Sequence, residues 1–282
     1  MRVYDFLTAK TADNAANGYA ICGLFPQHFI ISARVDLEAF RTVEAELVAR
    51  VDFDQYAGQY EAILAAQTNF FDRDNNYFAR YKIELVKQMV GRVDTVLDFG
   101  CGIGRSMAHL REIFPDADIV GCDPSAESLE MARSQNPTCR FVTTDELPED
   151  AKFDVVIASC VFHHIPPDNR QMAIRYCYSR LKHDGHFIIF EHNPINPVTR
   201  RLVKQCPFDT DAVLLSMRET IDRMRNAHLN VDESSYCLFF PKPLAALRAF
   251  EKYLGWLPMG GQYFVCASGP KAEPKPKLTR AA

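Results

Sequence analysis

A glycine-rich stretch, VLDFGCGIGRS at residues 96–106, holds the first residues that could do chemistry. Gly100, Gly102 and Gly104 have no Cβ atoms, so the chain there can turn tightly and let a ligand come close to the backbone. Asp123 follows the next apolar run, and an acidic residue in that place can accept hydrogen bonds from both hydroxyls of a ribose. The pattern predicts binding of a ribose-containing ligand. The alternative is a tight turn that binds nothing.

Four ionisable residues follow two later apolar runs. His163 and His164 come directly after one run, and Glu191 and His192 end another. An imidazole changes its charge near neutral pH, which suits it to general acid–base catalysis. If the reaction needs a base, we expect one of these four side chains to provide it.

Regular elements are needed to bring these residues together, and the sequence between Val93 and His192 predicts them. The runs that predict strands are 93–100, 117–123, 139–145, 153–162 and 186–192. The runs that predict helices are 104–114, 125–135 and 168–182, with Ser125 as the N-cap of the second. This alternation is typical of βαβ units, in which helices cover both faces of a parallel sheet. Ligands bind such a sheet beyond the carboxyl ends of its strands.

Two further strands are predicted near the end of the chain, at 234–240 and 261–268. An amphipathic helix at 244–257 is predicted between them. A parallel crossover needs a dozen or more residues, which this helix could supply. The residues alone therefore leave the direction of the last strand open.

Composition restricts the class of protein. Of 282 residues, 48% are hydrophobic and 24% are charged, which is ordinary for a globular domain, and the net charge of −4 argues against a nucleic-acid partner. The nine cysteines are scattered without a CxxC pair, so neither a disulfide framework nor a metal site is predicted. The apolar stretch 19–32 is too short to span a bilayer. We expect a cytoplasmic protein without a membrane span.

Taken in order, the motifs DFGCGIG, VGCDPSAESLEMAR and FHHIPP resemble those of class I S-adenosylmethionine (SAM)-dependent methyltransferases. The likeness covers roughly residues 52–268 and is closest to the bacterial group that modifies small molecules, which includes quinone-biosynthesis enzymes. It implies SAM as the cofactor. It also implies an α/β fold, with a Rossmann-like, doubly wound, seven-stranded sheet that is mostly parallel and has an antiparallel last strand.

The resemblance also assigns roles to residues. Asp98 and the glycine loop would hold the methionine part of the cofactor, Asp123 the ribose, and Asp145 with Glu146 the adenine. The residues expected to bind the cofactor are Asp98, Gly100, Cys101, Gly102, Ile103, Gly104, Asp123, Pro124, Asp145, Glu146, Ser159, Cys160, Tyr60 and Tyr81. A nucleophilic role for Cys160 is not expected, because the Pro-Cys pair of cytosine-methylating enzymes is absent.

Methyl transfer is an in-line displacement, and alignment of donor and acceptor can supply much of its rate. A hydroxyl acceptor also benefits from a base, for which His163, His164, Glu191 and His192 are the candidates. Alternation along VFHH would turn the two adjacent histidines opposite ways. In similar proteins the second position more often faces the cofactor, so we favour His164. The alternative is a structural turn with a packed histidine.

The predicted organisation has three parts. They are an N-terminal extension of unknown role (1–50), a methyltransferase domain (51–268) with cofactor-lid helices at 51–90 and an acceptor-side insertion at 193–232, and a disordered tail (269–282). The leading hypothesis is methyl transfer to an oxygen of a small-molecule acceptor. The alternatives are a macromolecular methyltransferase, which the sequence after the fourth strand disfavours, and a SAM-binding protein without turnover. No oligomeric state is predicted.

Overall fold

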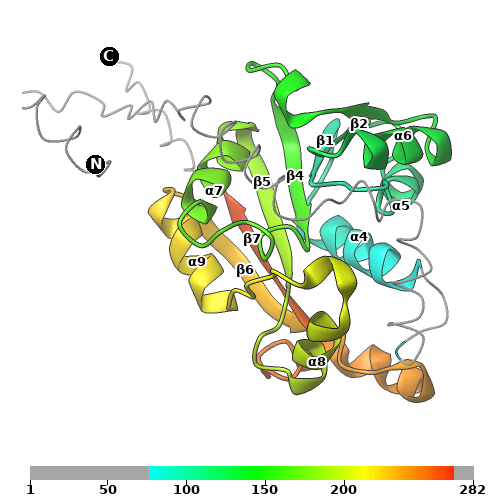
Figure 1. Ribbon diagram of the computed structural model, residues 1–282, viewed down its shortest axis with the longest axis vertical. Helices are drawn as coiled ribbons and strands as arrows, with labels where there is room; N and C mark the ends of the chain where they lie inside the picture. The colour runs from blue at the N-terminus through cyan, green and yellow to red at the C-terminus, as the bar shows by residue number, and fades with distance from the viewer. Residues whose placement is uncertain (1–70, 72–75, 270–282) are drawn as a thin grey trace, which may run out of the picture. The chain divides into compact units, whose positions relative to one another are not determined.

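The computed structural model describes Phe71 and residues 76–269 of the chain. Tyr60, the helices predicted in the first 70 residues, the 1–50 extension and the tail beyond Gly269 lie outside the described residues. Within them, seven strands form one sheet in the order β3-β2-β1-β4-β5-β7-β6 (Figure 1). The strands are β1 Thr95–Phe99, β2 Asp118–Cys122, β3 Arg140–Val142, β4 Phe153–Ser159, β5 Leu181–His192, β6 Asn230–Cys237 and β7 Gln262–Ser268.

Helices cover both faces of this sheet. They are α4 Tyr77–Met89, α5 Met107–Ile113, α6 Ala126–Gln135, α7 Arg170–Ser179, α8 Pro197–Gln205 and α9 Met217–Asn226, with 3-10 segments η2 Thr144–Glu146, η3 Pro207–Asp209 and η4 Lys242–Tyr253. Side chains of a strand alternate between the two faces. On β1, Leu97 and Phe99 pack in the core under α7 and α9, whereas Val96 packs in the core under α4, α5 and α6.

The predicted fold class is confirmed. Strands β1 to β5 run parallel to one another, and β7 is antiparallel to both β5 and β6, as the resemblance implied. The order reverses between β1 and β4, so the chain leaves these two strands in opposite directions along the sheet. Such a reversal opens a crevice at the carboxyl ends of the strands. Among the described residues, no helix combines the length and the apolar character that crossing a bilayer requires.

Some of the predicted caps and element boundaries are confirmed, and others differ from the structure. Ser125 caps α6 as predicted, with its hydroxyl accepting a hydrogen bond from the Ser128 backbone at 3.0 Å. The helix predicted over 244–257 forms over Lys242–Tyr253, but with 3-10 rather than α-helical geometry. Strand β5 begins before the predicted 186, since Gly185 lies inside it. A Cβ on Gly185 would lie 3.0 Å from the Phe153 carbonyl, and the pairing of β4 with β5 shifts register at that point.

Candidate cofactor and acceptor site

The loop between β1 and α5 holds its three glycines in left-handed conformations, with φ of 71° at Gly100, 52° at Gly102 and 79° at Gly104. A Cβ on Gly100 would lie 2.5 Å from the Val161 side chain, and one on Gly104 would lie 2.9 Å from the Asn136 amide. A Cβ on Gly102 would meet nothing within 4 Å among the described residues. Packing therefore requires two of the glycines, and open space beside Gly102 fits a bound ligand.

Asp123 ties this loop to the next helix. One carboxylate oxygen accepts the Gly102 backbone N–H at 2.8 Å, and the other accepts the Ser125 backbone N–H at 2.9 Å. A carboxylate has about four lone-pair sites, so Asp123 can accept several hydrogen bonds at once, including those from ribose hydroxyls. The position of Asp123 next to Gly102 is thus compatible with the role that the resemblance implies.

Asp98 is buried below the loop, where its carboxyl accepts a hydrogen bond from the Ser106 hydroxyl. Burial raises the pKa of Asp98 to about 6, although the bond from Ser106 acts in the opposite direction. An ammonium group of a ligand near this carboxyl would favour its charged form. The described residues at the carboxyl end of β1 therefore offer an acidic group suited to a cationic ligand.

Lys82 of α4 was not predicted as a site residue. Its buried ammonium donates to the Ser159 hydroxyl at 2.8 Å and to the Cys160 sulfur at 3.3 Å. A lysine is rarely buried unless it is paired. The available signal was its spacing, because Lys82 lies four residues from Phe78 and four from Val86, on the apolar side of the helix.

Cys160 follows β4 in a left-handed conformation, with φ of 60°. Burial raises the pKa of its thiol, but the nearby Lys82 ammonium and, to a smaller degree, His192 outweigh burial and lower the pKa to about 6. Gln262, the first residue of β7, donates to the same sulfur at 3.3 Å and lies 3.3 Å from His192 Nδ1. The Cys160 sulfur thus lies among hydrogen-bond donors at the carboxyl edge of the sheet.

Glu191, near the end of β5, organises the loop that follows β4. Its fully buried Oε1 accepts the backbone N–H groups of Phe162 at 2.7 Å and of His163 at 3.3 Å. Its Oε2 lies 2.7 Å from His163 Nδ1. Burial alone would lower the pKa of His163, but the Glu191 and Asp209 carboxylates raise it to about 10. Glu191 therefore fixes both the backbone and the ring of His163.

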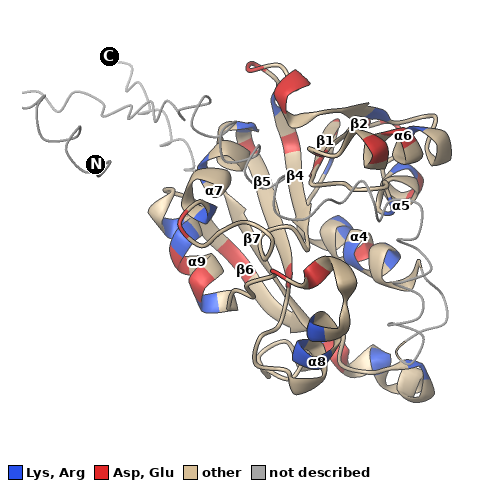
Figure 2. Cartoon of the chain, viewed as in Figure 1, with Lys and Arg blue, Asp and Glu red and all other residues tan. Residues whose placement is uncertain are grey.

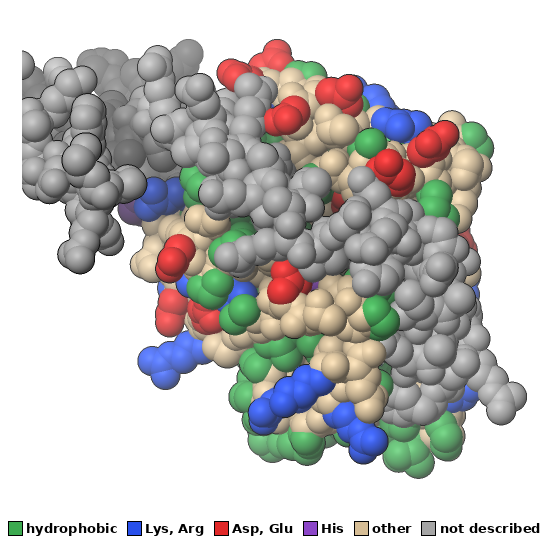
Figure 3. Space-filling view, viewed as in Figure 1, with side chains coloured by type: hydrophobic (Ala, Val, Ile, Leu, Met, Phe, Trp, Pro, Cys, Tyr) green, Lys and Arg blue, Asp and Glu red, His purple; other side chains and the backbone are tan. Residues whose placement is uncertain are grey.

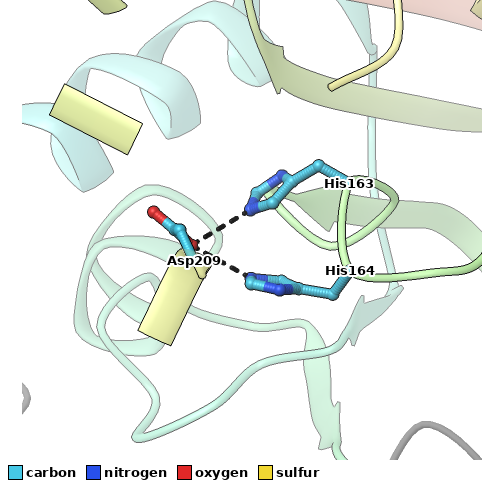
Figure 4. Close-up of side chains that lie close together, drawn as sticks. All are labelled: His163, His164 and Asp209. Atoms are coloured by element: carbon cyan, nitrogen blue, oxygen red, sulfur yellow. Dashed lines mark ion pairs between the residues drawn. The ribbon is translucent and has the colours of Figure 1, made fainter. Parts of the chain in front are cut away.

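Asp209, in η3, brings the two adjacent histidines together (Figure 4). Its Oδ1 lies 3.5 Å from His163 Nε2 and 3.4 Å from His164 Nε2. Burial raises the pKa of the Asp209 carboxyl, but its interaction with the neighbouring His163 lowers that pKa to about 2. Burial, and then the charge of His163, lower the pKa of His164 to about 3.

The expectation that His163 and His164 point opposite ways is wrong. Their ring centroids are 4.1 Å apart, and both rings approach the same carboxylate. Strand β4 ends at Ser159, and the His164 backbone N–H bonds back to the Val161 carbonyl. The histidines therefore lie in a turn, where the two-residue alternation of a strand does not apply.

The structure gathers all four proposed catalytic residues, since the His192 ring centroid lies 5.0 Å from that of His163. Asp209 was missed, because it comes from a segment without periodic pattern between α8 and α9. Gln262 was missed as well, because only the antiparallel pairing of β7 brings it beside His192.

The remaining residues that were predicted to bind the cofactor differ in burial and in their contacts. Cys101 and Ile103 are buried in the loop, whereas Pro124 is exposed. Asp145 and Glu146 lie exposed in η2, and the Glu146 carboxylate accepts the Thr143 backbone N–H at 3.0 Å. The Tyr81 hydroxyl donates to Glu251 at 3.1 Å.

With this geometry, the chain was compared with known proteins. A family model described as "Methyltransferase domain" matches residues 96–185. Over these residues the chain is similar to methyltransferase domains. The matched part holds the glycine loop, Asp123 and the two adjacent histidines, whereas Glu191, Asp209 and Lys82 lie outside it.

The chain spans less than half the length of two curated relatives that it matches. A malonyl-[acyl-carrier protein] O-methyltransferase from Herminiimonas arsenicoxydans is 31% identical over 49% of this chain and 48% of its own. A trans-aconitate 2-methyltransferase from Escherichia coli O157:H7 is 37% identical over 31% of this chain and 36% of its own. The likeness is thus to a shared domain.

A solved SAM-dependent methyltransferase from Archaeoglobus fulgidus has the same fold, with a TM-score of 0.56 and 16% identity. The match covers 72% of this chain and 97% of that one. The chain has the class I SAM-dependent methyltransferase fold. SAM is the cofactor of this class, and the open space at Gly102, beside the Asp123 carboxylate, fits it. The narrower likeness to quinone-biosynthesis enzymes stays a prediction.

Proposed function

We propose that this protein transfers the methyl group of SAM to an oxygen atom of a small-molecule acceptor. The observation that carries the proposal is the Glu191 carboxylate, which joins the end of β5 to the loop after β4. This carboxylate holds His163. His163 and His164 follow β4 and His192 ends β5, at the carboxyl edge of the sheet, where Gly102 follows β1. Polar groups next to the expected cofactor site support the proposal.

The cofactor side would be formed by the loop after β1. Gly102 offers bare backbone, Asp123 offers two carboxylate oxygens to the ribose, and Asp98 offers a buried acid to the amino group of the methionine part. Lys82 places a buried cation beside Ser159, where it could bind the carboxylate of the same part. Asp145, Glu146 and Tyr81 remain proposals for the adenine side and the lid.

The acceptor side would be formed by His163, His164, His192 and Asp209. SAM supplies a methyl group on a sulfonium, so the new bond to oxygen forms as the carbon–sulfur bond breaks and its electron pair stays on sulfur. The residues of the chain have to hold the acceptor in line with that bond, which can supply much of the rate enhancement. They also have to receive the proton of a hydroxyl acceptor, and an imidazole is suited to this.

The proposal is tested by supplying methyl-labelled SAM to the full chain together with a bacterial cell extract that has been divided into low-mass and macromolecular fractions. We expect label in a low-mass product, and none with the Asp123→Ala variant. His183→Ala, which changes an exposed histidine on β5, is the matched control and should keep wild-type transfer.

Label in the macromolecular fraction would replace the proposal by a protein or nucleic-acid methyltransferase. Binding of SAM without transfer to either fraction would support a SAM-binding protein without turnover.

A further inference from the structure

Two histidines and one aspartate converge where the sequence predicted no metal site. We propose that His163, His164 and Asp209 bind one divalent transition-metal ion. One candidate ligand atom from each of the three residues lies within 4.8 Å of the other two, and two of the three residues are buried. The binding of the ion does not depend on the proposed methyl transfer, which allows the two to be tested apart.

The distances fit coordination better than hydrogen bonding. His163 Nε2 and His164 Nε2 lie 3.5 Å and 3.4 Å from Asp209 Oδ1. Hydrogen bonds between nitrogen and oxygen are about 2.7–3.2 Å long, so both separations are too long. Ligands about 2.0–2.2 Å from a tetrahedral ion lie roughly 3.3–3.6 Å from each other. Both separations fall within that range.

Glu191 stands where a positioning residue for such an ion is expected. Histidines that bind a metal through one ring nitrogen usually donate the other N–H to a carboxylate, which fixes the tautomer. Glu191 Oε2 lies 2.7 Å from His163 Nδ1, which leaves Nε2 to face Asp209 and His164. Glu191 and Asp209 also place two carboxylates against one buried imidazole, and a divalent cation would balance both charges.

The donor set restricts the identity of the ion. Imidazole nitrogen suits zinc, iron, cobalt and nickel, whereas magnesium and calcium prefer oxygen ligands. Three protein ligands leave at least one coordination position open, as in catalytic zinc sites. At the carboxyl edge of β4 and β5, that position could hold an oxygen of the acceptor.

Titration with Co²⁺ tests the site directly, since its visible absorption reports the geometry of the bound ion. The full chain is first stripped with a chelator. We expect one equivalent of Co²⁺ to bind, to be displaced by Zn²⁺, and to resist displacement by Mg²⁺. His164→Ala and Asp209→Asn should each abolish the band, Glu191→Gln should weaken binding by about 10–100-fold, and His183→Ala should bind as wild type.

Calorimetry with S-adenosylhomocysteine, the demethylated product, is the companion measurement. Variants that lose the Co²⁺ band should still bind this product, which shows that they are folded and that the cofactor side is intact. The proposal is overturned if the wild type binds no stoichiometric Co²⁺, or if both ligand variants keep the band. Failure of product binding in the wild type would instead count against the proposed function.

An exposed row of large apolar side chains supports a second inference independently. Such side chains recur at every third residue along η4 and the following turn, and each residue is 40–76% exposed. The members of this apolar row are Leu244, Leu247, Phe250, Tyr253, Trp256 and Met259. In a 3-10 helix, residues three apart lie above one another, so Leu247, Phe250 and Tyr253 share one side of η4 after its kink at Leu244.

Basic residues flank the apolar row. Lys242 and Lys252 are exposed on η4, whereas the acidic Glu251 is buried and accepts the backbone N–H groups of Phe239 and Phe240. The neighbouring helix α8 is tied to this segment by a bond of 2.7 Å from the Asn196 side chain to the Met259 carbonyl. It exposes Val198, Arg200, Arg201 and Lys204 (Figure 2).

We infer that this surface docks onto an anionic lipid bilayer. Figure 3 shows hydrophobic side chains and basic side chains gathered side by side over α8 and the segment at 242–259. The combination of tryptophan, phenylalanine and leucine with flanking lysine and arginine is typical of elements that lie in a membrane interface. The basic side chains complement the charge of anionic headgroups.

Trp256 is the single tryptophan of the sequence, so its fluorescence reports on this surface alone. With vesicles of phosphatidylcholine and phosphatidylglycerol we expect a blue shift that is absent with phosphatidylcholine alone and that weakens at high salt. The double variant Arg200→Glu with Lys204→Glu should bind about tenfold more weakly or worse, and Phe250→Ser should reduce the shift. Arg92→Glu, before β1, is the control for a charge reversal away from this surface.

Absence of a shift with anionic vesicles would overturn the inference. So would an equal shift on raising protein concentration without vesicles, because that outcome assigns the row to contact between two copies of the chain. Retention of full binding in the Arg200→Glu, Lys204→Glu variant would also contradict it.

Discussion

Glu191 is the residue on which the acceptor side of the site depends. Its buried carboxylate accepts two backbone N–H groups of the loop after β4 and contacts the ring of His163. No hydrophobic side chain could replace these contacts, since the donors would then be buried without partners. The sequence predicted Glu191 only as a candidate base. Its side chain also holds the loop after β4 in place.

We predict that Glu191→Ala lowers the free energy of unfolding by about 3–5 kcal/mol, because it removes one partner of a buried charged pair. Urea denaturation checks the value. Glu233→Ala, which changes an exposed acid on β6, should stay within about 0.5 kcal/mol of wild type. A loss below about 1 kcal/mol in Glu191→Ala would show that the pair is not important for the fold.

Cys160 gives a second test at the residue scale. Its pKa of about 6 depends on Lys82 more than on His192, with burial acting against both. We predict that Lys82→Met moves the midpoint of the pH profile for Cys160 alkylation upward by roughly one to three pH units, whereas Lys82→Arg leaves it low. Mass spectrometry of the alkylated peptide measures the rate. An unchanged midpoint in Lys82→Met would contradict this assignment.

At the scale of elements, different glycines of the loop between β1 and α5 serve packing and ligand binding. Gly104 has close neighbours in α6 and at Asn136, whereas Gly102 has open space beside it. We predict that Gly102→Ala folds, at a cost of about 1–2 kcal/mol for its left-handed conformation, and weakens binding of S-adenosylhomocysteine. Gly104→Ala should cost more stability, because it adds close contacts to the same backbone strain.

Urea denaturation and calorimetry on the two glycine variants distinguish the roles. Wild-type affinity for S-adenosylhomocysteine in Gly102→Ala would show that the cofactor does not approach this backbone. Equal stabilities of the two variants would contradict the packing argument.

The strands were predictable from the sequence because each central strand is buried on both faces and therefore reads as an apolar run. Val155 to Ala158 of β4, which alternate between the two cores, are an example. The type of helix at 244–257 was harder to predict. Its exposed apolar residues recur at intervals of three, which is the period of the 3-10 helix η4. The site was predictable only where its residues follow strands directly. Asp209 and Lys82 reach it through tertiary packing, which has no local pattern.

At the scale of the whole molecule, the site is assembled from distant parts of the chain. Lys82 comes from α4, the glycines follow β1, Glu191 lies near the end of β5 and Gln262 begins β7. These elements meet only when the sheet is complete, so a ligand of the site should bind the folded state alone. Binding at a concentration 100 times the Kd then adds about 2.7 kcal/mol to the free energy of unfolding.

Calorimetric titration of the full chain and its Asp123→Ala variant with SAM, with NAD as the control ligand, tests the central claim most directly. We predict that SAM binds the wild type and raises its melting temperature, and that Asp123→Ala binds SAM at least about tenfold more weakly, because two ribose hydroxyls lose their acceptor. NAD should bind more weakly than SAM. Unchanged affinity in Asp123→Ala would remove Asp123 from the site, and tighter binding of NAD than of SAM would contradict the assignment as a whole.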